Sequence, residues 1–198
     1  MQSLSSCSPF LLVVGLFSFS ATLHGGDART AKVYRLQDEQ TIQVDGILDE
    51  AIWQQHETIG ELIQAIPRSG EEPSERTDVR VAYGDNAVYI AVHCFDRLPE
   101  EIVAQEMSRD ATLFNDDYIQ LLLDTFHDGR NAYYFQTNPL GALVDGRITE
   151  SGRPDTNWDG VWYVQVQVVD DGWTAEFEIP FKTLSFQPDN STWGFNIS

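Results

Sequence analysis

Hydrophobic and polar residues alternate along most of the chain after about residue 32, and this alternation is the pattern of half-buried β-strands. It is clearest in residues 79–83, 88–95, 162–168 and 173–179. Between the last two segments lies Asp170-Asp171-Gly172, a sequence typical of a tight hairpin turn. The pattern therefore predicts a succession of antiparallel strands joined by turns.

Helical periodicity, in contrast, is scarce. Asp49 is a suitable N-cap for one short helix through Ala51, Ile52 and Trp53. About nine or ten short strands with so little helix do not fit a fold of alternating strands and helices. We therefore predict an all-β fold, an antiparallel β-sandwich of the jelly-roll kind with one short helix.

The N-terminus differs from the rest of the chain. Residues 9–23 form an apolar run that suits a signal peptide and is too short for a membrane-spanning helix, although no Lys or Arg precedes it. We expect residues 1–28 to be removed and residues 29–198 to form one domain of an exported protein, in the periplasm, at the outer membrane or outside the cell. An uncleaved membrane anchor is the alternative. Cys7 would leave with the signal peptide, so Cys94 would have no partner for an intrachain disulfide.

The charge of the chain limits the classes of partner that it can bind. The formal net charge is −19, whereas nucleic acids and anionic lipid surfaces bind basic patches. Neutral sugars, and divalent cations held by carboxylates, are compatible with such acidity. The sequence contains no GxSxG, HExxH or glycine-rich phosphate loop, so we do not expect this segment to be an enzyme. A hydrolase role of a full-length protein stays open.

Six short motifs follow one another between about residue 41 and residue 198. They are VDGILDEAIW at 44–53, a strand pair at 77–83 and 87–96, NDD and LD at 115–117 and 123–124, YFQTNPLG at 134–141, GWTAEFEIPF at 172–181, and WGFN at 193–196. In this order they resemble the family 9 carbohydrate-binding modules and their relatives. The resemblance implies a β-sandwich that binds sugar, with aromatic side chains that clamp a terminal sugar unit.

The resemblance is strongest to the branch in which this module precedes a longer, membrane-associated C-terminal region. The last motif reads as a strand in which the sequence stops. We therefore expect the segment to be a monomeric N-terminal domain whose partners are a carbohydrate and the membrane-associated part of the same protein.

Sugar recognition needs a flat apolar face for the C–H groups of the ring. Trp158 follows a polar loop and is the strongest candidate for this platform. Phe114 is a candidate for the opposing face. Trp162 is a third candidate, although it begins an apolar strand face and fits the core better.

Hydroxyl recognition needs polar side chains beside that platform. Asp116, Asn138 and Arg130 are the candidates, because carboxylate, amide and guanidinium groups can each bond adjacent hydroxyls. Asn138 precedes a proline and fits a turn equally well. Arg130 fits equally well into a surface ion pair with Asp128.

Metal binding is a further expectation. The resemblance implies a structural calcium ion, and calcium prefers carboxylate and carbonyl oxygens. Asp117, Asp124 and Asp128 are the candidate ligands, although their spacing does not form an EF-hand loop. Otherwise we expect no cofactor.

Two alternatives to sugar binding remain open. One is a non-binding structural domain at the N-terminus of an outer-membrane-associated protein. The other is a haem or redox domain, because some relatives of this sandwich architecture bind haem; its axial ligands would come from His93, His127 and Met107.

Overall fold

The structure is a computed structural model, and it describes residues 11–14, 29–37, 39–59, 62–64, 68–149, 152 and 154–198. The strands are β1 Leu11–Val14, β2 Arg29–Lys32, β3 Tyr34–Arg35, β4 Thr77–Tyr83, β5 Ala87–Phe95, β6 Ile119–Asp124, β7 Ala132–Thr137, β8 Val144–Ile148, β9 Pro154–Asp155, β10 Tyr163–Val169, β11 Gly172–Pro180 and β12 Thr192–Ile197. The helical elements are α1 Ala51–Gln55 and the 3-10 turns η1 Pro99–Glu101 and η2 Phe181–Thr183.

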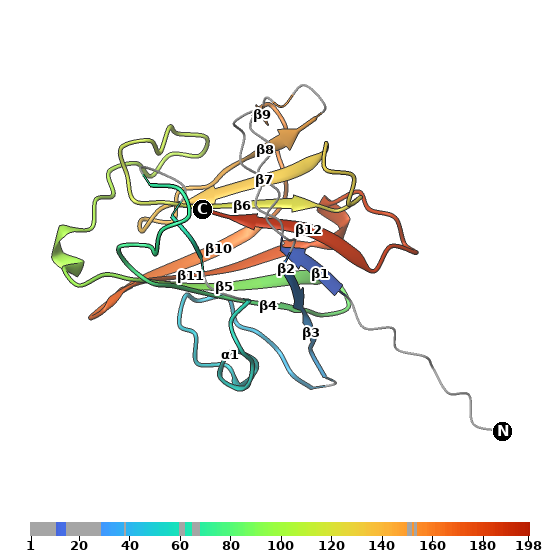
Figure 1. Cartoon of the computed structure of the whole chain (residues 1–198), viewed down its shortest axis with the longest axis horizontal. Helices are drawn as coiled ribbons and strands as arrows, with labels where there is room; N and C mark the ends of the chain where they lie inside the picture. The colour runs from blue at the N-terminus through green and yellow to red at the C-terminus, as the bar shows by residue number, and fades with distance from the viewer. Residues whose placement is uncertain are drawn as a thin grey trace.

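These strands form two sheets that pack face to face (Figure 1). One sheet has the order β2-β1-β12-β6-β7-β8-β9, and the other has the order β10-β11-β5-β4-β3. All neighbouring pairs are antiparallel except β1 with β12 and β3 with β4. The prediction of an all-β sandwich with one short helix is confirmed.

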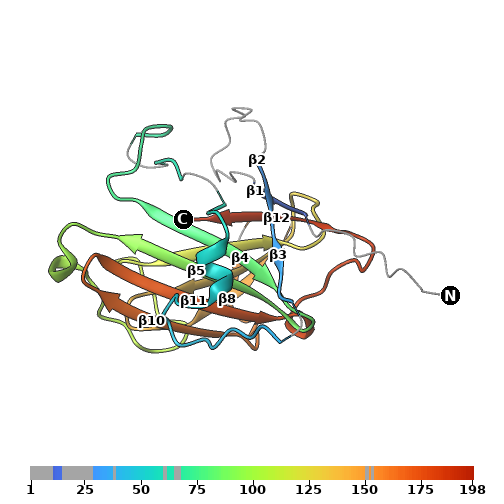
Figure 2. The same ribbon diagram turned by 90° about the horizontal axis from the view of Figure 1, so that it is seen from below.

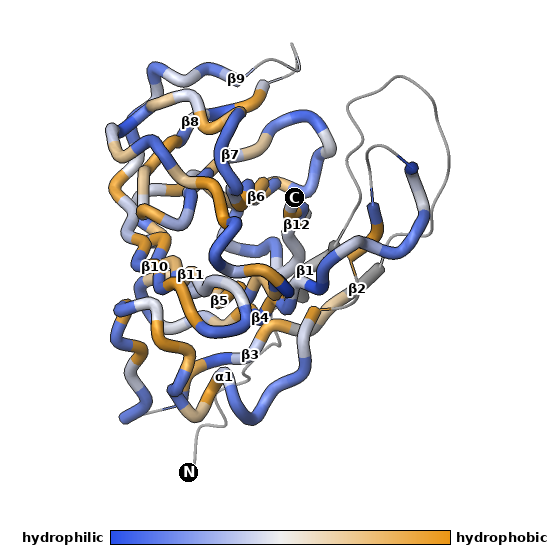
Figure 3. Tube along the Cα trace, turned by 90° about the vertical axis from the view of Figure 1, so that its left-hand side faces the viewer, coloured by the Kyte–Doolittle hydropathy of each residue, from blue (hydrophilic) through white to orange (hydrophobic). Residues whose placement is uncertain are grey.

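The core lies between the two sheets and is built from alternate residues of the longer strands, β4 to β7 and β10 to β12. Val79, Val92, Phe135, Phe177 and Phe195 have no exposed side-chain surface. Figure 3 shows this pattern along the chain, with hydrophobic segments in the strands and hydrophilic segments in many of the loops. Burial of this apolar surface supplies most of the stability of such a sandwich.

A segment before β4 packs on the outer face of the five-stranded sheet, with α1 lying across it (Figure 2). Trp53 Nε1 donates a hydrogen bond of 2.8 Å to Glu176 Oε1, and the backbone N–H groups of Asp45 and Gly46 donate to Glu176 Oε2 at 3.0 and 3.3 Å. We call residues 45–53 the clasp. It joins the first and fifth sequence motifs in space through Trp53 of the first and Glu176 of the fifth.

The clasp binds the carboxyl group of Glu176, and the pKa of this group is strongly shifted. Glu176 is fully buried, and this burial raises its pKa to about 7. The neighbouring Glu50 raises the pKa further, whereas the N–H donors of Trp53, Asp45 and Gly46 act in the opposite direction.

Part of the expected signal peptide lies in the seven-stranded sheet. β1 pairs with β12 on one side and with β2 on the other. Cleavage and export stay predictions, and Cys7 lies outside the described residues. Among the helices in the described part of the chain, none is long and apolar enough to span a membrane. Cys94 is a free cysteine, and burial raises the pKa of its thiol to about 12.

Candidate ligand-binding site

Two of the predicted hydroxyl-binding residues meet in a buried polar cluster. Asn138 Nδ2 donates to Asp116 Oδ2 at 2.7 Å and to the Glu106 carbonyl oxygen at 2.8 Å. Asn138 Oδ1 accepts hydrogen bonds from the backbone of Leu140 and Ala142. The amide therefore ties the turn after β7 to the long connection that precedes β6.

Asp116 completes this cluster. Its Oδ2 accepts the backbone N–H groups of Gln105 and Glu106, both at 3.1 Å. Burial alone would raise the pKa of Asp116, but these bonds and the one from Asn138 outweigh it and lower the pKa. Because Asn138 is 0% exposed and its amide is fully engaged, it has a structural role and cannot contact a surface ligand.

Exposed apolar side chains surround this cluster. Phe114 is 82% exposed, in a turn closed by the bond from Asp116 N to the Leu113 carbonyl oxygen. Met107 and Leu140, next to members of the cluster in the chain, are 73% and 43% exposed. Phe114 is thus a surface aromatic residue, and its role as the opposing face of a sugar site stays a prediction.

The two predicted tryptophans differ in their surroundings. Trp162 is 3% exposed and packs against Phe135 and Phe177, with ring centroids 5.3 and 6.1 Å apart. Its assignment to the sugar site was wrong, because an indole inside the core has no free face for a ligand. Trp158 is partly buried, and its ring lies against Tyr133 at 5.0 Å.

Trp158 stands beside a charged cluster that sequence reasoning missed. Its ring packs so closely on Gly160 that a β-carbon there would lie 2.6 Å from the indole. Arg109 donates to the Gly160 carbonyl oxygen at 3.3 Å, to Asp159 Oδ1 at 3.2 Å and to Asp145 Oδ1. Arg109 and Trp158 therefore both contact Gly160.

The buried member of this cluster fixes the position of the others. Asp145 has no exposed surface, and its second oxygen accepts the Gly160 N–H at 2.6 Å. Burial raises the pKa of Asp145, although the Gly160 N–H, Trp162 and Arg109 act against this shift. In contrast, 39% of the Arg109 side chain and 76% of the Asp159 side chain are exposed. The cluster thus presents N–H donors and a carboxylate to solvent from a rigid base.

Only a weak sequence signal pointed to this cluster. Asp145 lies in β8 opposite Phe135, where the strand pattern would place an apolar residue facing the core. A charged residue at such a position needs a partner. Nothing in the sequence identified that partner as Arg109, which lies 36 residues earlier in the chain.

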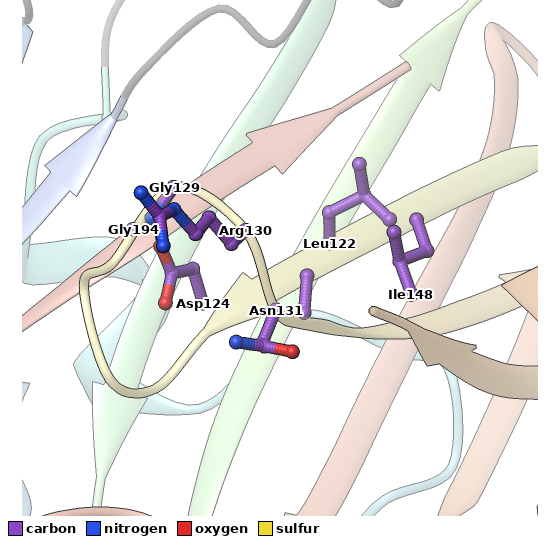
Figure 4. A pocket seen from close by; sticks show the side chains of 8 residues that line it. Leu122, Asp124, Gly129, Arg130, Asn131, Ile148 and Gly194 are labelled. Atoms are coloured by element: carbon purple, nitrogen blue, oxygen red, sulfur yellow. Dashed lines mark hydrogen bonds between the residues drawn. The ribbon is translucent and has the colours of Figure 1, made fainter. Parts of the chain in front are cut away.

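Arg130 lies elsewhere, in the turn between β6 and β7, at the opposite end of these strands from Asp116 and Asn138. It lines a small hollow on the outer face of the seven-stranded sheet (Figure 4). Leu122 and Ile148 lie at one side of the hollow, and Asp124 and Arg130 lie at the other. The hollow has no aromatic lining, so it is a weaker candidate for sugar than the surface beside Trp158.

The three predicted calcium ligands do not form one group in the described part of the chain. Asp124 accepts backbone N–H groups of Asp128 and Gly129, and Asp128 accepts those of Arg130 and Asn131. Both carboxylates therefore shape the β6–β7 turn. Asp117 bonds instead to the backbone of Val103.

No three His, Cys, Asp or Glu side chains are grouped suitably for a metal ion within the described ranges. The structure thus gives no support to a calcium site made of Asp117, Asp124 and Asp128, and calcium binding stays a prediction.

The candidate haem ligands are also dispersed. His93 stacks on Phe95 and contacts Asp171 at 3.1 Å on the five-stranded sheet. His127 lies in the β6–β7 turn, and Met107 lies in the connection between η1 and β6 and is 73% exposed. The three candidates thus belong to three different elements of the fold.

A two-sheet sandwich does not by itself define a function, because the same architecture serves many functions. The chain matches the family described as "Carbohydrate family 9 binding domain-like" over residues 44–198, and it belongs to this family. This is a family of binding domains, in agreement with a non-enzymatic role for the segment. The comparison with curated proteins gives no match.

Solved structures share the fold at low identity. A family 9 carbohydrate-binding module from Caldicellulosiruptor kristjanssonii in complex with cellotriose is 18% identical with a TM-score of 0.56, over 83% of this chain and 73% of that one. A complex of such a module from the same organism with glucose is 19% identical with a TM-score of 0.50, over 83% of this chain and 74% of that one. A protein from Bacteroides uniformis ATCC 8492 is 14% identical with a TM-score of 0.53, over 69% of this chain and 67% of that one.

Proposed function

We propose that this domain binds a neutral carbohydrate at the surface formed by Trp158, Arg109 and Asp159. The observation that carries the proposal is the position of Arg109, held between a buried and an exposed carboxylate and sharing Gly160 with an indole ring. Family membership supports the ligand class, since the module from C. kristjanssonii was solved with cellotriose and with glucose.

Each group has a separate task in this site. The exposed part of the Trp158 ring offers an apolar surface to the C–H groups of a sugar. Arg109 donates to ring hydroxyl oxygens, and Asp159 accepts from hydroxyl groups. Asp145 acts as a positioning residue, because it holds Arg109 and Gly160 in place without being exposed. Such a small polar site favours modest affinity, on the order of micromolar to millimolar.

Calorimetry with Asp159→Ala tests the site. We expect wild-type protein to bind glucose or cellotriose and Asp159→Ala to bind about tenfold more weakly, since one charged hydrogen bond is lost. Asp85→Ala is the matched control, because Asp85 is also exposed and paired with an arginine, Arg35, on another part of the surface. Equal losses in both variants, or no heat from any sugar with wild-type protein, would contradict the proposal and favour a non-binding structural domain.

We also propose that the domain acts outside the cytoplasm as the N-terminal module of a longer exported protein. The apolar run at residues 9–23 supports this role. Expression of the full coding sequence, followed by cell fractionation and N-terminal sequencing, provides the test. A mature N-terminus near residue 29 in the periplasmic or membrane fraction is the expected result, and an intact cytoplasmic protein would refute it.

A further inference from the structure

The outer face of the five-stranded sheet carries a row of two tyrosines and one glutamate. Tyr163 on β10 pairs with Glu178 on β11, and Glu178 pairs in turn with Tyr89 on β5. Paired residues on neighbouring strands point to the same face of a sheet. Because the adjacent Val164 and Phe177 point into the core, this row lies on the outside.

The row is open at the edge of the sheet. Tyr163 is 52% exposed, because β10 is the edge strand, and Val161 before it is 53% exposed. Tyr89 is partly buried against the cluster of Ala82 and Ala91. Burial, and then the nearby charge of Glu178, raises the pKa of the Tyr89 hydroxyl group. The surface thus offers one exposed ring, one carboxylate and one partly covered ring.

Two features define the limits of this surface. On one side the clasp approaches β10, where Gln167 Nε2 donates to the Asp45 carbonyl oxygen at 3.3 Å. On the other side the chain runs directly from Tyr163 through Val161 back to Gly160. Tyr163 is three residues from Gly160, so the tyrosine row begins within about 11 Å of the Trp158–Arg109 site.

The spacing and charge of the row indicate one kind of ligand. Neighbouring strands lie about 4.8 Å apart, so the backbones of Tyr163 and Tyr89 are separated by about 10 Å, the scale of a disaccharide. Glu178 accepts hydrogen bonds from hydroxyl groups, and with a net charge of −19 the molecule repels anionic ligands. A neutral sugar chain satisfies both conditions.

We propose that the Tyr163–Glu178–Tyr89 row binds the further units of a linear neutral oligosaccharide whose first units occupy the Trp158–Arg109 site. This inference rests on the proposed function, because it extends the same site. With this row, the domain would bind several successive units of a sugar chain. An aromatic clamp for a terminal unit would bind only one end of the chain.

Titration calorimetry with trimers and hexamers of the cello-, xylo- and malto-series tests this extension. We expect wild-type protein to bind the hexamer of its preferred series about tenfold more tightly than the trimer. Tyr163→Ala should remove this advantage without changing trimer affinity, and Tyr163→Phe should retain most of it because the ring remains. Tyr118→Ala is the matched control, since Tyr118 is 39% exposed and precedes β6 in the other sheet.

The outcomes separate this inference from the proposed function. Equal wild-type affinity for trimer and hexamer in every series would overturn the extension and leave the Trp158–Arg109 site standing. A hexamer advantage that survives Tyr163→Ala would also overturn it. If no sugar binds, both proposals fail. Because Tyr163 is an exposed residue on an edge strand, an unchanged thermal unfolding curve will show that the variant is folded.

Discussion

Asn138 shows how a residue that looks like a ligand group can belong to the scaffold. Its side chain makes four hydrogen bonds, to Asp116, Glu106, Leu140 and Ala142, and has no exposed surface. The asparagine-proline sequence indicated a turn but not these partners. Glu106 lies 32 residues away and Asp116 lies 22 residues away, and only the folded chain brings them together.

Replacing Asn138 with Ala should therefore destabilise the protein, because this side chain belongs to the buried scaffold and not to the surface. Buried donors and acceptors would lose their partners, so we expect the free energy of unfolding to fall by about 2–4 kcal/mol. Urea denaturation measures this loss. Asn157→Ala is the control, because Asn157 is exposed and bonds only within its own turn to Asp155. Similar stability of the two variants would show that the buried cluster contributes little.

At the scale of elements, the strands were the most predictable part of the chain. Predicted segments 162–168 and 173–179 correspond to β10 and β11, because a sheet with one face in the core imposes strict alternation. A short helix through residues 51–53 was also predicted, and the observed helix spans residues 51–55. Its N-cap is Glu50 rather than Asp49, and Glu50 makes no side-chain capping bond.

The candidate site was less predictable, because it depends on contacts between loops. Alternation identified Trp162 as a core residue better than as a ligand residue, and its burial agrees with that pattern. Arg109 lies in a loop with no periodic pattern, and its importance comes from Asp145 on a distant strand. Sequence spacing alone holds no information on such a pair.

The clasp makes stability depend on pH. The pKa of Glu176 is raised from 4.5 to about 7, so the folded state holds this proton more tightly than the unfolded state. Below pH 4.5 both states are protonated and the contribution is complete. Between pH 4.5 and about 7 only the unfolded state ionises, so stability should fall as pH rises, by at most about 1.4 kcal/mol per pH unit.

Glu176→Gln tests this mechanism. The variant should lose the pH dependence in that interval, and it should be less stable at low pH because its amide N–H₂ group opposes an N–H donor of the clasp. Thermal unfolding measured at intervals from pH 4 to pH 8 gives the profile. Glu101→Gln, at an exposed position in η1, is the control and should retain the wild-type slope. If Glu176→Gln retained this slope as well, another group would be responsible.

At the scale of the whole molecule, the stability of the fold and its affinity for a sugar should depend on salt in different ways. A net charge of −19 on one domain causes self-repulsion that opposes the folded state. Salt screens this repulsion, since the Debye length falls from about 10 Å at 0.1 M to about 3 Å at 1 M. We therefore expect the midpoint of thermal unfolding to rise by several degrees between these concentrations of sodium chloride.

Affinity for a neutral sugar, in contrast, should hardly change over the same range, because no ion pair forms between ligand and protein. Calorimetric titrations of cellotriose at about 0.1 M and 1 M salt should give dissociation constants within about twofold. A large loss of affinity at high salt would contradict binding through hydroxyl groups and ring faces, because cellotriose carries no charge for salt to screen. A site that binds through hydroxyl groups and ring faces can work on this acidic surface, where an anion would be repelled at long range.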